Sequence, residues 1–221
     1  LFGWPGGETT PLAKVRNATV ASHSIALPGA GTSLVLCDIW FEQPVVSPNP
    51  AFLQTGAGDV QVIRCTVEAQ GNTGEVWATS SPTTFTLCTI NGNGVNPTDY
   101  ALRVSTGSFT VLDHTTVLGQ SCLIVEAGAS VYAKDSRLTA SGTYAINSLG
   151  VSTSLDYCTV IGVIAGNPAG TGTAGDLVFT IKWCGIEILA IDGLNVVGTA
   201  KADLGATTHG TLTPINGALV F

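Results

Sequence analysis

The sequence predicts an all-β protein that winds into a single-stranded parallel β-helix of about seven to eight coils with a non-repeating C-terminal cap. The main observation is a triplet that recurs every 19 to 28 residues: a small residue, a polar residue, and a β-branched residue or leucine. A short period of this kind is typical of a solenoid, in which one repeat cannot bury its apolar face alone. Parallel crossovers are generally right-handed, which is the hand we expect. The triplet occurs at Ala18-Thr19-Val20, Cys37-Asp38-Ile39, Cys65-Thr66-Val67, Cys88-Thr89-Ile90, Thr115-Thr116-Val117, Ser136-Arg137-Leu138 and Cys158-Thr159-Val160, with a looser match at Cys184-Gly185-Ile186.

Each repeat also contains two short apolar runs separated by turn residues. One run precedes the triplet by about 11 to 13 residues, as at Phe52-Leu53, and another lies directly before the triplet, as at residues 109–112. Gly, Pro and Ser lie between the runs, where the chain must change direction. One coil is therefore expected to hold three short strands and three bends. No apolar stripe of helical period and length accompanies them.

The chain divides into three parts in order. Residues 1–14 carry no repeat and are expected to form an N-terminal arm, and residues 15–190 form the coils. Long connections follow the triplets at residues 40–50, 91–98 and 161–175, so they are expected at one edge of the solenoid. From about residue 191 the repeat is lost. Residues 191–221 are expected to be a cap or docking tail, because the open end of a solenoid needs covering.

The pattern of triplets, apolar runs and turns resembles the single-stranded β-helices of the pectate-lyase-like superfamily and of phage tailspike, fibre and capsid-decoration proteins. The resemblance covers roughly residues 15–190 and rests on the repeat pattern alone. It implies the fold, together with a role in a virus particle or in polysaccharide degradation. Because a fold does not imply a function, the choice between these roles depends on particular residues.

The composition is apolar and poor in charge. Hydrophobic residues make up 45% of the chain and charged residues 10%, with a net charge of −7, whereas soluble domains average about 25% charged residues. We therefore expect another subunit or a larger particle to cover part of the surface. Eight Lys and Arg residues are too few for the cationic cluster that nucleic-acid binding needs, and no apolar run is long enough to span a membrane.

The cysteines are predicted to be packing residues rather than disulfide partners. Parallel side chains one strand spacing apart, about 4.8 Å, hold their β-carbons beyond the roughly 3.5–4.5 Å that a disulfide prefers. Free thiols indicate assembly in a reducing cytoplasm. Without a CxxC motif or a His beside the cysteines, no metal or cofactor is expected. Cys122 lies apart in an apolar run, and the other cysteines join Thr115 and Ser136 in a predicted inner ladder of Cys37, Cys65, Cys88, Thr115, Ser136, Cys158 and Cys184.

The candidate catalytic residues are Asp113, Asp135 and Asp156, which precede three consecutive triplets, with His114 beside the first. On consecutive coils they are expected within one or two strand spacings, about 5–10 Å. Two carboxylates at that distance suit glycoside hydrolysis, one as general acid and the other as base or nucleophile. Asp is also common at bends, where its side chain bonds the local backbone, and this is the interpretation that we favour.

Three further features are weaker candidates. Lys134 and Arg137 flank Asp135 and are the only candidates for the base of a lyase. Trp40 begins a long connection, where its ring could stack on a sugar. The outward residues of the triplets resemble the threonine arrays of ice-binding β-helices, but the row is one residue wide and charges interrupt it. This row contains Asp38, Thr66, Thr89, Thr116, Arg137 and Thr159.

These observations favour a structural or adhesive virion component of the tailspike, fibre or capsid-decoration type. The chain is expected to associate with itself as a homotrimer and with a larger viral surface such as a capsid or tail. The sequence contains no complete catalytic constellation, so a polysaccharide-degrading β-helix enzyme is the alternative. An ice-binding or other surface-binding β-helix is the second alternative.

Overall fold

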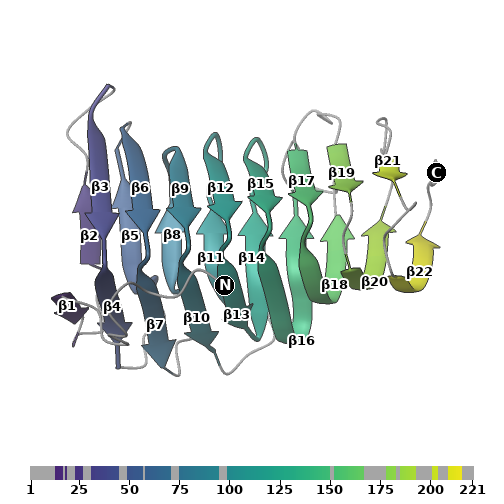
Figure 1. Cartoon of the computed structure of the whole chain (residues 1–221), viewed down its shortest axis with the longest axis horizontal. Helices are drawn as coiled ribbons and strands as arrows, with labels where there is room; N and C mark the ends of the chain where they lie inside the picture. Colours follow the sequence, from purple (N-terminus) through teal and green to yellow (C-terminus); the bar gives the residue numbers. More distant parts are fainter. Residues whose placement is uncertain are drawn as a thin grey trace.

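The chain forms a parallel β-solenoid whose N-terminal and C-terminal coils lie at opposite ends of a row of strands (Figure 1). The computed structural model describes residues 13–16, 18, 23–26, 31–44, 49–56, 58–70, 75–94, 99–149, 152–166, 178–182, 185–192, 201–203 and 209–215. Among these residues no helix is long and apolar enough to cross a membrane.

The strands lie in three columns that follow the length of the solenoid, and one column is an eight-stranded sheet (Figure 1). Each of its strands pairs in parallel with the equivalent strands of the neighbouring coils. In spatial order from the N-terminal end these strands are β3 (Ser33–Cys37), β6 (Asp59–Ile63), β9 (Thr83–Thr86), β12 (Phe109–Asp113), β15 (Ser130–Lys134), β17 (Ser152–Asp156), β19 (Val178–Lys182) and β21 (Lys201–Asp203).

The other two columns belong to one fourteen-stranded sheet. The first column contains β1 (Ala13–Arg16), β4 (Ile39–Gln43), β7 (Thr66–Gln70), β10 (Thr89–Asn93) and β13 (Thr116–Gly119). The second column contains β2 (His23–Ala26), β5 (Phe52–Thr55), β8 (Trp77–Thr79), β11 (Tyr100–Val104) and β14 (Ser121–Val125). The columns merge at β16 (Arg137–Ser148), which pairs with both β13 and β14, and the sheet continues through β18 (Thr159–Gly166), β20 (Gly185–Asp192) and β22 (His209–Ile215).

This arrangement confirms the predicted all-β parallel solenoid. The eight-stranded sheet has one strand per coil, which agrees with the seven to eight coils expected from the repeats. Strands β21 and β22 pair in parallel with β19 and β20. Both sheets therefore have strands in the segment 191–221 that the sequence predicts to be a non-repeating cap. Residues 1–12 of the predicted arm lie outside the described residues.

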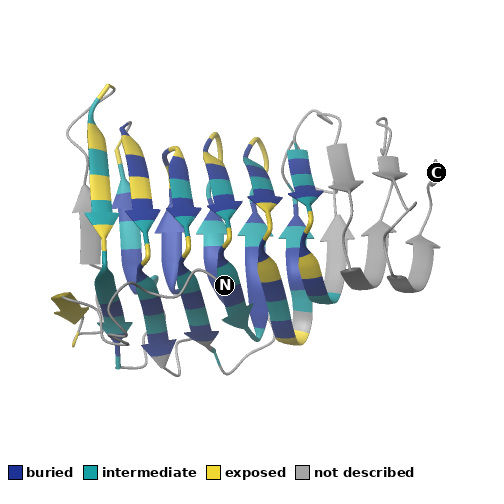
Figure 2. Cartoon of the chain, in the orientation of Figure 1, coloured by how far each residue is buried: buried dark blue, intermediate teal, exposed yellow. Residues whose placement is uncertain are grey.

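The core is a set of stacked rows, and buried residues alternate with more exposed ones along strands such as β6, β9 and β12 (Figure 2). One inward row comes from the last residue of the triplets: Val67, Ile90, Val117, Leu138 and Val160, all at most 1% exposed. Rows on the other columns face it, such as the paired residues Trp77, Leu102, Leu123 and Ile146. Larger rings fill the N-terminal coils, where Phe41, Phe52, Trp77 and Phe85 contact one another with ring centroids 5.2 to 5.9 Å apart.

One residue per coil turns the chain from the eight-stranded sheet into the first column of the other sheet. These corner residues have φ between 48° and 57°, a region that non-glycine residues rarely adopt. Backbone hydrogen bonds between coils hold the conformation, as from Arg64 N to Thr86 O (2.9 Å) and from His114 N to Lys134 O (3.0 Å). The corner residues are Asp38, Arg64, Leu87, His114, Asp135 and Tyr157.

The strand register corrects the first two predicted triplets. Cys37 pairs with Ile63, and Trp40 pairs with Thr66, so Ile39 occupies the position that Cys65 has in the next coil. Cys37 therefore precedes the corner and is exposed, and its predicted place in the inner ladder is wrong. In the first coil Ala13 takes the equivalent position instead of Ala18. Cys-Asp-Ile matches the triplet by residue type only, because a pattern of small, polar and branched residues does not say where the corner lies.

The remaining inner ladder consists of Cys65, Cys88, Thr115, Ser136 and Cys158, all at most 4% exposed. Their role is hydrogen bonding as well as packing. Thr115 Oγ1 lies 3.0 Å from Phe85 O in the preceding coil and 3.1 Å from Asp113 O, and it accepts the backbone N–H of Cys88 at 3.4 Å. Cys88 Sγ is placed likewise, 3.1 Å from Val62 O and 3.5 Å from Cys65 N. A small side chain that both donates and accepts therefore satisfies the backbone beside the corners at Leu87, His114 and Asp135. Cys184 lies outside the described residues.

We expect one fast-reacting thiol among the described cysteines, that of Cys37. Cys65, Cys88, Cys122 and Cys158 are buried free thiols. The hydrogen bond with the Cys65 thiol and burial raise the pKa of Cys88, and burial raises the pKa of Cys122 to about 12. Because the thiolate is the nucleophile, the raised pKa values slow alkylation of Cys88 and Cys122 at neutral pH, and burial slows that of all four thiols. Mass spectrometry of peptides from the natively alkylated protein checks this, and labelling of Cys88 as fast as that of Cys37 would contradict it.

Candidate functional site

The candidate acidic residues lie at the corner between the two sheets. Asp113 ends β12, Asp156 ends β17, and Asp135 is the corner residue after β15. Asp adopts positive φ more readily than most residues, so Asp135 has a conformational role in the turn. The side chains of Asp113 and Asp135 keep 37% and 33% of their surface exposed. Solvent therefore reaches both carboxylates.

His114 lies between two of these carboxylates. Its Nδ1 is 2.8 Å from Asp113 Oδ1 and its Nε2 is 3.8 Å from Asp135 Oδ2. One ligand atom from each of the three residues lies within 4.8 Å of the others, a spacing that could hold a metal ion. The ammonium of Lys134 lies 3.8 Å from the same Asp135 oxygen. This cation would repel a metal ion bound beside it.

The register fixes the separation of Asp113 and Asp156, two of the three candidate carboxylates. Asp113 pairs with Lys134, and Lys134 pairs with Asp156, so the aspartates are two strand spacings apart, about 10 Å, with a cation between them. Opposite charges on neighbouring strands stabilise the pairing modestly. The two carboxylates thus lie at the upper end of the expected 5–10 Å, with the Lys134 side chain at the position between them.

Asp135 lies in the turn as predicted, but the contacts of Asp113 and Asp135 are with neighbouring side chains. Asp113 contacts His114, and Asp135 approaches His114 and Lys134, whereas bonds to the local turn backbone were expected. The two cations considered for a lyase make local contacts as well. Lys134 lies near Asp135, and Arg137 donates from Nε to Thr139 Oγ1 at 3.1 Å. The corner is therefore a network of neighbouring charges and not a catalytic pair in a cleft.

Trp40 is less available for sugar stacking than the sequence indicates. Lys14 Nζ lies 3.9 Å from the ring centroid, a cation–π contact that occupies one face of the ring. The indole N–H donates to Glu68 Oε2 at 3.1 Å, and Lys14 also pairs with Glu42 at 2.8 Å. The ring is thus held among charged side chains of β1, β4 and β7.

The predicted outward threonine row changes at its N-terminal end. Trp40, and not Asp38, lies beside Thr66, while Thr66, Thr89 and Thr116 pair in consecutive coils and Arg137 follows. Asp38 instead accepts two hydrogen bonds from the Arg64 guanidinium, at 2.8 and 2.7 Å, and these lower the pKa of the carboxyl. An uninterrupted row of three threonines gives little support to ice binding.

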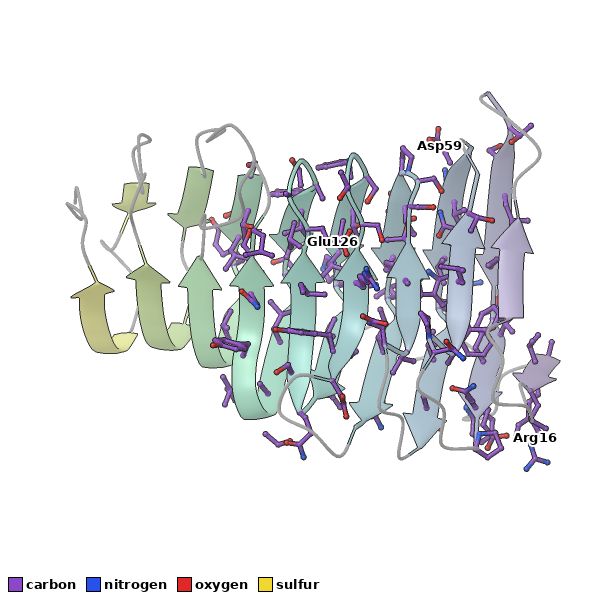
Figure 3. All side chains as sticks on the ribbon, turned by 180° about the vertical axis from the view of Figure 1, so that it is seen from behind. Arg16, Asp59 and Glu126 are labelled. Atoms are coloured by element: carbon purple, nitrogen blue, oxygen red, sulfur yellow. The ribbon has the colours of Figure 1, made fainter. Side chains whose placement is uncertain are left out.

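Arg103 makes the main ion-pair cluster of the second column. Its Nε donates to Glu126 Oε1 at 2.7 Å, and its guanidinium also reaches Glu75 Oε1 at 3.3 Å. Glu126 and Arg16 lie far apart along the stack, so the charged groups do not gather in one place (Figure 3). Partly exposed pairs of this kind contribute little to stability. The cluster links three neighbouring coils.

A groove whose described lining residues are uncharged lies in the first column, toward the end where the two columns merge. It has a volume of about 280 Å³ and crosses three successive coils at β10, β13 and β16. The sequence analysis missed it, although glycines four residues after Cys88 and Thr115 are a signal, because they mark a narrow corner. A Cβ at Gly92 would lie 3.1 Å from Ala101, and one at Gly119 would lie 2.7 Å from Ser121 O. The groove is lined by Asn91, Gly92, Gly94, Leu118, Gly119, Gln120, Thr139 and Ser141.

The outer surface of the eight-stranded sheet exposes large apolar side chains. Val35 on β3 and Phe109 on β12 point outward, and Leu87 and Tyr157 are corner residues at the edge of the same sheet. These four side chains are between 46% and 55% exposed. They are spread along the sheet from β3 to the corner after β17, and apolar groups exposed along one side of a protein can form an interaction surface.

Comparisons of the chain with protein-family models, curated proteins and solved structures find no match in any of the three.

Proposed function

We propose that the chain is a structural or adhesive component of a virus particle, of the tailspike, fibre or capsid-decoration type, and that it assembles as a homotrimer. The observation that carries the proposal is the exposed apolar surface of the eight-stranded sheet, with Val35, Leu87, Phe109 and Tyr157 about half exposed. A second chain packed on this surface would remove the apolar side chains from water. The low charge of the chain supports the same conclusion, because few charges would have to be desolvated.

The contacts at the acidic corner also support a non-enzymatic role. Lys134 lies between Asp113 and Asp156 in the register, and the groove of described residues is lined without a carboxylate. A hydrolase of this class needs two carboxylates that face one substrate. We therefore favour assembly and adhesion over polysaccharide cleavage, and the resemblance of the repeat pattern to phage β-helices supports the virion part of the proposal.

The solution mass of the full chain tests the assembly. Light scattering is expected to give three times the mass of one chain, or more if trimers associate further. The double substitution Leu87→Lys and Phe109→Lys is expected to reduce the mass to that of a monomer with an unchanged β circular-dichroism signal, because charges would have to be buried at the interface. Thr116→Lys, on the outer side of β13, is the control and should leave the mass unchanged.

Two results would contradict the proposal. A stable monomer of the unsubstituted chain at high concentration would contradict the assembly. The virion part is checked separately, because tryptic peptides of the chain are expected in purified virus particles that package its gene, and their absence there would contradict it.

A further inference from the structure

We propose that the groove between β10, β13 and β16 binds a short stretch of a neutral, hydroxyl-rich ligand, that is, an uncharged carbohydrate chain. The proposal specifies the adhesive part of the proposed function and rests on it. It places the contact on the fourteen-stranded sheet, away from the apolar surface of the eight-stranded sheet that would hold the subunits together.

The shape of the groove follows from the lengths of the strands that form it. β13 has four residues, whereas β10 on one side has five and β16 on the other has twelve. The chain therefore turns at Gly119 and Gln120, whereas the strands of both neighbouring coils extend beyond this position. The resulting hollow of about 280 Å³ is open to solvent on one side, and its size is close to the lower end of small-molecule sites, about 300 Å³. It suits one or two sugar rings of a longer chain.

The polar groups of the groove match hydroxyl groups. Within the described part of the chain, the side-chain amides of Asn91 and Gln120 make no hydrogen bond, so each offers donors and an acceptor. Ser141 Oγ donates to Gly119 O at 3.3 Å, which leaves its oxygen able to accept. A sugar hydroxyl both donates and accepts, so amides and hydroxyls are its natural partners. Leu118 supplies an apolar contact for the ring carbons.

The charges around the groove favour an uncharged ligand. None of the described lining residues is ionisable. Arg137 donates from Nε to Thr139 Oγ1 at 3.1 Å and lies outside the lining. An acidic sugar would thus lose hydration without a direct ion pair inside the groove. Without a carboxylate in the lining, a bound chain would be held and not cleaved.

Ligand-observed saturation-transfer NMR on the full chain tests the proposal. The probes are maltotetraose, cellotetraose and chitotetraose, which are neutral, and tetragalacturonate, which is acidic. We expect at least one neutral probe to bind weakly, with a dissociation constant on the order of 1 mM, and more tightly than tetragalacturonate. The double substitution Asn91→Ala and Gln120→Ala should weaken binding about tenfold, because two hydrogen-bonding groups are removed. Ser141→Tyr should abolish binding by filling the groove.

Gln61→Ala is the matched control, because Gln61 is an exposed amide on the eight-stranded sheet and its loss should leave binding unchanged. No binding of any neutral probe at about 10 mM, binding of tetragalacturonate alone, or binding that survives the groove substitutions would overturn the proposal. Light scattering on the same samples separates the two proposals. A trimer that does not bind contradicts the groove proposal alone, and a monomer that binds contradicts the assembly alone.

Discussion

Replacing Val67 with aspartate is expected to unfold the N-terminal coils. Val67 is fully buried and lies in register between Phe41 and Ile90. A carboxylate at this position would have no partner in an apolar stack, and an unpaired buried charge costs several kcal/mol. That is comparable with the total stability of about 5–15 kcal/mol of a typical domain. Because each coil is supported by its neighbours, the loss is expected to spread along the stack.

Urea unfolding followed by circular dichroism measures this effect. Thr66→Asp is the matched control, because Thr66 is the adjacent residue on the outward side of the same strand and is only half-buried. The control should change the free energy of unfolding by no more than about 0.5 kcal/mol. Equal stability of the Val67→Asp and Thr66→Asp variants would contradict the burial of Val67 in the core.

Replacing Thr115 with valine is expected to lower the free energy of unfolding by about 2 kcal/mol. The substitution preserves the shape of the side chain but removes the hydroxyl that bonds Phe85 O and accepts the N–H of Cys88. The N–H of Cys88 would lose this acceptor, and a buried donor left without one costs about 1–3 kcal/mol. Packing alone predicts the opposite result, since valine is the more apolar residue.

Thr115→Ser separates the two interpretations of the inner ladder. Serine retains the hydroxyl and loses one methyl group, which costs about 0.8 kcal/mol. Urea unfolding of both variants is therefore expected to rank wild type first, serine second and valine last. A valine variant as stable as wild type would show that the ladder residues act through packing only.

The sequence was sufficient for the fold in the central coils. From Cys65 to Cys158 the triplets coincide with the register, because the inward positions there repeat in size and in hydrogen-bonding type. It failed at Cys37, because the corner is Asp38, two residues later along the chain than the triplet implied. Large residues replace the small ones in that coil, and the pairing with β7 decides which residues oppose each other.

The candidate site was less predictable than the fold. The sequence placed Asp113 and Asp156 near the same corner, but it did not indicate that Lys134 lies between them in the register. The groove had no motif, since Asn91, Leu118 and Gln120 are separated by a whole coil or by a turn and meet only because β13 is short. The spacing of residues along the chain does not predict these contacts. The coils differ in length, and each difference changes which residues are neighbours in adjacent coils.

The sequence by itself determined that the chain forms parallel coils with apolar rows inside, because a period-two alternation repeated once per coil can bury its apolar face only by stacking. Only the tertiary structure decided where each coil turns, why the ladder needs Cys, Thr or Ser, and which surfaces are left open. Those properties depend on contacts between residues more than twenty positions apart, such as that of Thr115 Oγ1 with Phe85 O. Backbone groups that need a partner at the corner acquire one only when the next coil is in place.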